Sequence, residues 1–253
     1  MNKTKMPHVD FTWNPFTGCT HGCKWCYARA VYNRFGKCFS PATHENRLHQ
    51  PKRVTKPSVI FCGSAGDIAD CPPEFAAKVL DVMRKTPQHQ YLMLTKRPFD
   101  THSTLGTFSQ PDNLWMGISV TDNEKLHEHI TELSNIFFPS TKRAVLSAEP
   151  LLGELTDLDH ALSFGKEQLL SPWIEWIIVG GKSLGKPLHD PKRYDGGKMW
   201  LTQICDCAKK HNIPILYKHG GSEIPDVFEV FSGRTYKDNP IRDAVNAIEL
   251  CTK

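Results

Sequence analysis

Short runs of apolar residues recur along the chain, and longer polar or amphipathic stretches separate them. The runs are continuous and rich in isoleucine, leucine and valine, a pattern typical of strands buried on both faces of a parallel sheet. The strands that this pattern predicts are Val59–Cys62, Tyr91–Leu94, Leu114–Val120, Ala144–Leu146, Trp176–Val179 and Ile213–Tyr217, with an earlier one at Phe11–Trp13.

Helical patterns occupy three of the stretches between these strands, at Pro73–Arg84, Asn123–Asn135 and Lys198–His211. The repeated alternation of strand and helix predicts an α/β fold, a complete or partial TIM barrel with parallel strands, and leaves an open doubly wound sheet as the alternative. The chain of 253 residues suits a single barrel domain, 1–253, whose C-terminal tail from about residue 222 to 253 is either part of the barrel or an appendage.

Polar and charged residues follow directly after most of the predicted strands. In a parallel barrel the carboxyl ends of the strands line the active site, so we expect several of these side chains to share one pocket. Solvation at the surface is the alternative for each of them. The charged residues in these positions are Asp67, Lys96, Arg97, Asp122, Glu149, Lys182 and Lys218.

The composition is that of an ordinary globular protein, with 40% hydrophobic and 23% charged residues. No apolar run approaches the ~18 residues of a membrane-spanning helix, and the polar segment Met1–Asp10 does not resemble a signal peptide. We therefore expect a cytoplasmic protein with no membrane partner. Thiols stay reduced in the cytoplasm, so the nine cysteines need an explanation other than disulfides.

Positive charge is concentrated in one segment. Residues 24–56 contain eight lysines and arginines and a single acid, Glu45, which gives the segment a net charge of +7 in a chain of +4 and leaves the remainder at −3. A clustered basic segment suits a polyanion, such as nucleic acid or a phosphate-bearing substrate, and a solvated basic surface is the alternative.

Three cysteines, Cys19, Cys23 and Cys26, stand at the spacing C-x3-C-x2-C, and a chance match to this spacing has a probability of about 1%. Thiolates select zinc, copper(I) or iron–sulfur clusters. A structural zinc site usually takes four protein ligands, often as two separated pairs, and no second C-x2-C follows. Three cysteines on a [4Fe–4S] cluster leave one iron open to a cofactor or substrate. The spacing therefore favours an iron–sulfur cluster over zinc or ordinary buried thiols.

The cysteine segment resembles the signature of the radical S-adenosylmethionine (SAM) superfamily, C-x3-C-x-aromatic-C, with Trp25 at the aromatic position. Motifs along nearly the whole chain are similar to those of the phage-associated three-cysteine-motif family of that superfamily. The chain departs from this family at Lys182, where a glutamate usually follows two glycines, and in the compact spacing of its first two cysteines. The similar motifs are Thr12–Pro15, Gly18-Cys19, Cys26–Ala28, Leu94–Pro98, Trp115–Val120, Ser147–Leu152, Val179–Gly181 and Pro214–Lys218.

The resemblance implies a partial TIM barrel of the radical SAM type, a [4Fe–4S] cluster on the three cysteines, and S-adenosyl-L-methionine as a second cofactor. In that superfamily the cluster donates an electron to SAM, and the resulting 5′-deoxyadenosyl radical takes a hydrogen atom from an unactivated carbon. The residues that the resemblance suggests for binding SAM are Tyr27, Ser64, Asp67, Gly180 and Gly181. The alternatives are that Asp67 caps a helix, that the two glycines form a tight turn, and that Tyr27 packs in the core.

The predicted substrate-facing residues carry charge. Lys96 and Arg97 suit a phosphate or a carboxylate, and Glu149 suits an amine or accepts a proton. An arginine and a glutamate on neighbouring strands could instead pair with each other. Cys62 would either donate a hydrogen atom to a product radical or fill the core. The set predicted to be catalytic is Lys96, Arg97, Glu149 and Lys218, with Lys182 beside it.

These observations predict a radical SAM enzyme, of the isomerase or lyase type, that modifies or isomerises a nucleobase or its amino-acid appendage in phage DNA, as in thymidine hypermodification. The alternatives are DNA repair of the photoproduct-lyase kind, a radical SAM enzyme acting on a peptide or small metabolite, and a zinc-stapled DNA-binding module. We expect DNA or a nucleotide as substrate, a flavodoxin or ferredoxin as electron donor, and the host cytoplasm as the location of a phage-encoded protein.

Overall fold

The structure, a computed structural model, describes residues 1–6, 8–106, 108–132, 143–169, 174–181, 191–219, 230–231, 234–235 and 238–251. The chain divides into two compact units. Met1–Gly117 and Pro240–Lys253 belong to the first unit, and Ile118–Asn135 and Arg143–Asn239 belong to the second.

The sheet of the first unit has the strand order β1 (Asn2–Lys3), β2 (Phe11–Trp13), β5 (Val59–Cys62), β6 (Gln90–Thr95) and β7 (Leu114–Ser119), and the last two residues of β7 belong to the second unit. Strands β2, β5 and β6 are parallel, and β1 is antiparallel to β2. A separate antiparallel hairpin joins β3 (Phe16–Thr17) to β4 (Ala42–Thr43).

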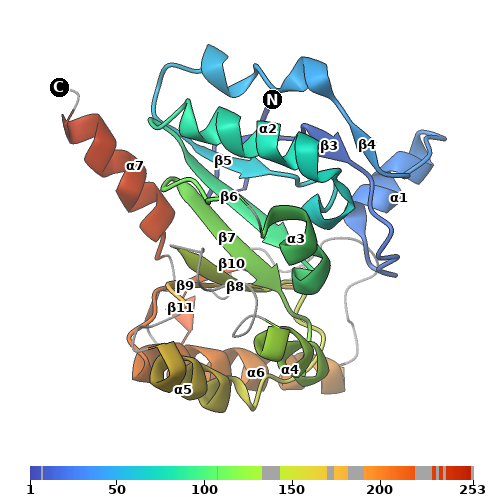
Figure 1. The fold of residues 1–253 in the computed structure, drawn as a ribbon. Coiled ribbons are helices and arrows are strands. Elements are labelled where there is room, and N and C mark those ends of the chain that lie inside the picture. Colours follow the sequence, from blue (N-terminus) through green and yellow to red (C-terminus); the bar gives the residue numbers. More distant parts are fainter. Residues whose placement is uncertain are drawn as a thin grey trace. The chain divides into compact units, whose positions relative to one another are not determined.

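Helices and short 3-10 turns complete the first unit. The helices are α1 (Tyr27–Arg34), α2 (Pro73–Arg84), α3 (Pro98–Leu105) and α7 (Pro240–Cys251), and the 3-10 turns are η1 (Glu45–Arg47), η2 (Pro51–Arg53) and η3 (Ile68–Asp70). A proline at the first position starts α2, where its missing N–H costs nothing, and one face of the helix is buried from Phe75 to Met83. Helix α7 contacts β5 and β6 (Figure 1).

The second unit repeats the parallel arrangement. Strands β8 (Ala144–Ala148), β9 (Trp176–Gly180) and β10 (Ile215–His219) are parallel neighbours. Its helices are α4 (Asn123–Glu132), α5 (Leu158–Leu169) and α6 (Pro191–Lys210), and α5 contacts both of the others. All three lie together in Figure 1. A two-stranded hairpin, β11 (Val230–Phe231) and β12 (Arg234–Thr235), completes the described elements.

All seven predicted strands are present. Strands β7, β8 and β9 are buried at every position, as their continuous apolar runs indicate, whereas Phe11 and Thr12 of β2 are half-buried. In β6, Tyr91, Leu92 and Met93 are all almost completely buried. The helix predicted at Lys198–His211 begins earlier, at Pro191, and that predicted at Asn123–Asn135 is described as far as Glu132. Helix α3 had no apolar signal, because two of its buried residues, Thr101 and Thr104, are polar. Among the described residues, no helix combines the length and apolarity needed to cross a membrane.

Candidate functional site

The three cysteines lie in a loop between β3 and α1, and glycine sets the start of this loop. Gly18 has a φ of +83°, in the left-handed region that side chains avoid. A Cβ atom at this position would lie 2.1 Å from the carbonyl oxygen of Ser40. Only glycine therefore allows the loop to pass this close to the segment that leads into β4. We name residues 18–26 the cysteine loop.

The cysteine loop is fastened to the segment after β5. The N–H of Gly18 donates to the carbonyl of Ala65 at 2.9 Å, and Gly18 and Gly66 form a parallel bridge. Asn14, at the end of β2, fixes the same segment: its Oδ1 accepts from the N–H of Ala65 at 2.9 Å, and its amide donates to Ser64 at 3.1 Å. The ends of β2 and β5 thus hold the loop in place.

Backbone N–H groups point at two of the three sulfurs. Cys26 is the N-cap of α1, and its Sγ accepts from the N–H of Arg29 at 3.4 Å. The Sγ of Cys19 accepts from the N–H of His21 at 3.4 Å. A helix N-terminus and N–H donors favour negative charge, so this environment suits thiolates or an anionic cluster.

Burial in the cysteine loop affects two of the thiols and an indole N–H. Burial raises the pKa of Cys19 to about 12, the N–H of His21 opposes this, and the carboxylates of Asp67 and Asp70 add to it. Burial also raises the pKa of Cys23, while the ammonium of Lys96 lowers it. The indole Nε1 of Trp25 is buried and has no acceptor among the described residues. Buried donors usually find a partner, so this N–H indicates that an acceptor belongs in the loop.

The spread of the three sulfurs bears on which metal fits. Around a single zinc ion, sulfurs at ~2.3 Å from the metal lie within about 4 Å of one another. Among the described residues, the one group of three or more metal-ligating atoms within 4.8 Å of one another lies elsewhere, at Asp159, Cys207 and His211. At least two sulfurs of the cysteine loop therefore lie more than 4.8 Å apart, which is wider than one zinc ion allows and compatible with a multi-iron cluster. The donor set, the N–H groups and the spacing all fit a [4Fe–4S] cluster.

Arg97 is bound to the cysteine loop. Its Nη1 donates to Thr20 Oγ1 at 2.9 Å and to Asp70 Oδ1 at 2.7 Å, and its Nε donates to Asp100 at 2.7 Å. Asp70 in turn accepts from the N–H of Thr20 at 2.9 Å and from its hydroxyl at 2.7 Å. The sequence suggested that Arg97 contacts substrate, and it did not identify Thr20, Asp70 and Asp100 as its partners. The spacing of these residues does not reveal that the loop meets the segments after two strands.

Asp67 is nearly buried, and the backbone and side chains of its own unit occupy both of its carboxylate oxygens. It caps η3 through the N–H of Ala69 at 3.1 Å and accepts from the hydroxyl of Thr95 at 2.8 Å and from the N–H of Lys96 at 3.2 Å. Burial raises its pKa against these hydrogen bonds. The capping alternative is thus observed, and binding of SAM by Asp67 stays a prediction.

Two other residues predicted to bind SAM lie beside the cysteine loop. The hydroxyl of Tyr27, in the first turn of α1, donates to the carbonyl of Ser64, and the ring is 45% exposed rather than packed in the core. Cys62, by contrast, is completely buried. The structure therefore gathers eight of the predicted residues in the first unit: Cys19, Cys23, Cys26, Tyr27, Ser64, Asp67, Lys96 and Arg97.

The remaining predicted residues lie in the second unit. Lys218, in β10, donates to Glu149 Oε1 at 2.7 Å, and both side chains are largely buried. Gly180, at the end of β9, approaches the same carboxylate so closely that a Cβ atom would lie 3.1 Å from its carbon atoms. Glu149 thus pairs with Lys218 rather than with Arg97. Gly181 follows β9, and Lys182 lies outside the described residues.

A family model covers most of the chain. Residues 3–242 match the model of the family described as "Protein of unknown function (DUF5131)". No curated protein matches the chain.

Several solved structures share the fold. A single mutant of spore photoproduct lyase is 9% identical, with a TM-score of 0.62 over 87% of this chain and 78% of that one. A mutant of the same enzyme with dinucleoside spore photoproduct is 10% identical, with a TM-score of 0.57 over 98% and 74% of the two chains. A double mutant with bound AdoMet and dinucleoside spore photoproduct is 9% identical, with a TM-score of 0.50 over the same shares. The likeness confirms the predicted fold, an α/β partial barrel with parallel strands.

Proposed function

We propose that this chain, which belongs to the family of proteins of unknown function DUF5131, is a radical SAM enzyme. One observation carries the proposal: the cysteine loop presents three spread sulfurs, two N–H···S hydrogen bonds and an unpartnered indole N–H within a fold of the radical SAM type. When bound, the cluster and SAM would supply the 5′-deoxyadenosyl radical.

The chain's own residues would hold and position these groups. Cys19, Cys23 and Cys26 would bind three irons, and Trp25 Nε1 would donate to the cluster. The N–H donors to the sulfurs lower the electron density on them, which raises the reduction potential of such clusters. Tyr27, Ser64 and Asp67 are our candidates for SAM in the first unit, and Gly180 and Gly181 are those in the second.

Anaerobic iron and sulfide analysis tests the proposal first. We expect about four irons per chain, and 5′-deoxyadenosine after dithionite and SAM are added. Changing any of the three cysteines to alanine should abolish both signals, while C38S, an exposed thiol outside the loop, should keep them. One tightly held zinc and no 5′-deoxyadenosine would make the chain a metal-stapled binding protein instead.

DNA is the substrate that the surface favours. Helix α1 follows the cysteine loop directly, and its exposed residues Tyr27 and Val31 and its C-cap Phe35 are four positions apart, with Phe35 68% exposed. Exposed Lys24, Arg34 and Lys37 surround them in sequence. Aromatic rings stack on bases and cations attract phosphates, so this face of α1 combines the two components of single-strand binding.

A salt titration of DNA affinity tests this surface. The variant K24E/R34E/K37E should bind DNA more weakly than the wild type. The slope of log binding constant against log salt concentration should also become shallower, by roughly 0.9 for each phosphate contact removed. A matched variant, K3E/K5E/K85E, reverses three exposed charges elsewhere in the first unit and should bind as the wild type does. Equal affinities of the two variants would favour a peptide or small metabolite as the substrate.

The finer proposal is isomerisation of an amino-acid appendage on thymine in phage DNA, with Glu149 and Lys218 among the catalytic residues and a flavodoxin or ferredoxin as the donor. Incubation with such DNA, SAM and reductant should give a nucleoside of unchanged mass and altered chromatographic mobility. The variant E149Q should keep its iron and lose this product. Product formed only from ultraviolet-damaged DNA would instead indicate repair.

A further inference from the structure

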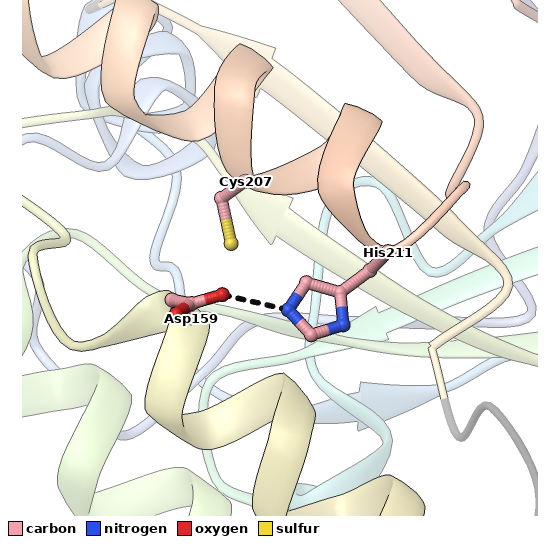
Figure 2. Close-up of side chains that lie close together, drawn as sticks. All are labelled: Asp159, Cys207 and His211. Atoms are coloured by element: carbon pink, nitrogen blue, oxygen red, sulfur yellow. Dashed lines mark hydrogen bonds and ion pairs between the residues drawn. The ribbon is translucent and has the colours of Figure 1, made fainter.

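A second group of metal-ligating side chains lies in the second unit, where α5 and α6 meet. Asp159 is in the first turn of α5, and Cys207 and His211 are at the C-terminal end of α6 (Figure 2). One carboxylate oxygen, the thiol and one imidazole nitrogen all lie within 4.8 Å of one another. Figure 2 shows the sulfur of Cys207 directed at the Asp159 carboxylate, which itself faces His211.

The end of α6 is shaped so that Cys207 and His211 point the same way. The N–H of His211 donates to the carbonyl of Cys207 at 3.1 Å, which continues the last helical turn and places the two residues four apart on one face. Asn212 then has a φ of 55°, with Asn212 N–H donating to Lys209 at 3.1 Å and Ile213 N–H to Ala208 at 2.8 Å. This is the Schellman ending of a helix, and it fixes the backbone of His211.

The two oxygens of the Asp159 carboxylate have different neighbours. Its Oδ2 accepts from the ammonium of Lys210 at 2.7 Å, and its Oδ1 lies 2.8 Å from Nε2 of His211. Metal-binding carboxylates are commonly oriented in this way, with one oxygen hydrogen-bonded to a neighbour and the other on the metal. The Cys207 side of the group is screened from water, because Cys207 is only 8% exposed.

We propose that Asp159, Cys207 and His211 bind a zinc ion that joins α5 to α6. One thiolate, one imidazole and one carboxylate are the ligands that zinc prefers, and water would complete the tetrahedron. On binding, the Cys207 thiol releases its proton to solvent. His211 binds through Nε2 as the neutral imidazole protonated at Nδ1, so the proton between Nε2 and Asp159 also passes to solvent. Ligand atoms around zinc lie ~3.3 Å apart, so the His211–Asp159 pair needs to open by only about 0.5 Å.

The dipoles of the two helices favour the charges of the proposed site, a cation near the end of α6 and a carboxylate at the start of α5. The C-terminal end of α6 carries partial negative charge, which attracts a metal ion, and the N-terminal end of α5 carries partial positive charge, which stabilises the Asp159 carboxylate. The proposed site does not depend on the cysteine loop, and its test is therefore separate from that of the radical SAM activity.

Cobalt(II) titration of the full chain tests the proposal, in the variant C19A/C23A/C26A, which removes the competing thiols of the cysteine loop. We expect one equivalent to bind, with visible bands of tetrahedral cobalt and a single thiolate-to-cobalt charge-transfer band that zinc abolishes. Adding C207S should remove the charge-transfer band, and adding H211A should weaken binding by at least about tenfold. Adding C205S, a buried thiol two residues away, should leave the titration unchanged.

Iron-loaded wild-type protein provides the second measurement. After incubation with zinc and gel filtration, it should retain one zinc per chain, and its C207S and H211A variants should retain less, with circular dichroism showing that each is folded. A titration without tetrahedral cobalt bands, or a charge-transfer band that persists in C207S, would overturn the proposal. The trio would then be only an ion pair between two helices.

Discussion

At the residue scale, the cysteine loop depends on side chains that sequence reasoning did not connect to it. Thr20 lies inside the loop, and Asp70 and Arg97 reach it from the segments after β5 and β6. Each of these contacts is charge-assisted, which makes it stronger than a neutral hydrogen bond. Arg97 therefore has a positioning role toward the loop, whatever it contributes to substrate.

Gly18 provides a residue-scale prediction with a matched control. Gly18 and Gly36 both have positive φ, but a Cβ atom would collide with Ser40 at Gly18 and would meet nothing within 4 Å at Gly36. We expect G36A to cost about 1 kcal/mol in the free energy of unfolding, and G18A to cost several times more and to lose its iron. Urea unfolding and iron analysis measure both effects. Equal losses in the two variants would contradict the clash.

Asp70 provides a prediction about pH. Its burial disfavours the charged form, but the hydrogen bonds from Thr20 and Arg97 outweigh it, and the pKa is lowered. The stabilisation is therefore present above the ordinary aspartate pKa of ~3.9 and is lost as pH falls through the folded value. In iron-free protein, the deficit of D70N relative to wild type should be full at neutral pH and should shrink below about pH 4.

Urea midpoints across this pH range provide the measurement for Asp70. The control is D100N, which removes a more exposed partner of the same guanidinium and should show a smaller deficit. A D70N deficit that stayed constant down to low pH would show that the Asp70 carboxylate is not ionised in the folded protein.

At the element scale, α7 is distant in sequence from the strands it contacts, and an ion pair attaches its start to them. Both terminal nitrogens of Arg242 donate to the two carboxylate oxygens of Asp10 at 2.8 Å, and Asp10 also accepts from the N–H of Val59 at 2.8 Å. This joins the start of α7 to β5 and to the residue before β2. The end of the chain is thereby part of the first unit.

Removing this attachment tests its contribution. R242A should lower the free energy of unfolding by about 1–2 kcal/mol, because a bidentate, partly buried ion pair contributes more to stability than an exposed one. R34A, which removes an exposed arginine of α1, should stay within about 0.5 kcal/mol of wild type. Denaturant unfolding at neutral pH measures both, and an unchanged midpoint for R242A would show that α7 is held by apolar packing alone.

At the scale of the whole molecule, the proposed cluster couples folding to metal content. A group that binds only the folded chain stabilises it by linkage, by ~3 kcal/mol when it is present at about 100 times its dissociation constant. For a chain of this size that corresponds to roughly 6–12 °C in melting temperature. Anaerobic, iron-loaded wild type should exceed C19A/C23A/C26A by this amount, and C38S should melt with the wild type. Equal melting temperatures would show that the loop folds without its metal.

The sequence by itself determined where the strands lie and which three cysteines form a motif. Both are local patterns: a strand buried on two faces must be continuously apolar, and three thiols in eight residues need no long-range contact to be recognised. It also predicted that Lys96 follows a strand, as it does after β6, while its catalytic role stays a prediction.

Only the tertiary structure decided how the polar residues are used. Arg97 holds the cysteine loop and Glu149 pairs with Lys218, and these partners are 77 and 69 residues away in the sequence. Asp67 caps a 3-10 turn, which depends on how the backbone turns after it. The trio of Asp159, Cys207 and His211 has the same origin, since two helices must pack before these atoms meet. Hydrophobic periodicity reports which side chains are buried, whereas hydrogen bonds and metal ligation depend on which buried surfaces come together.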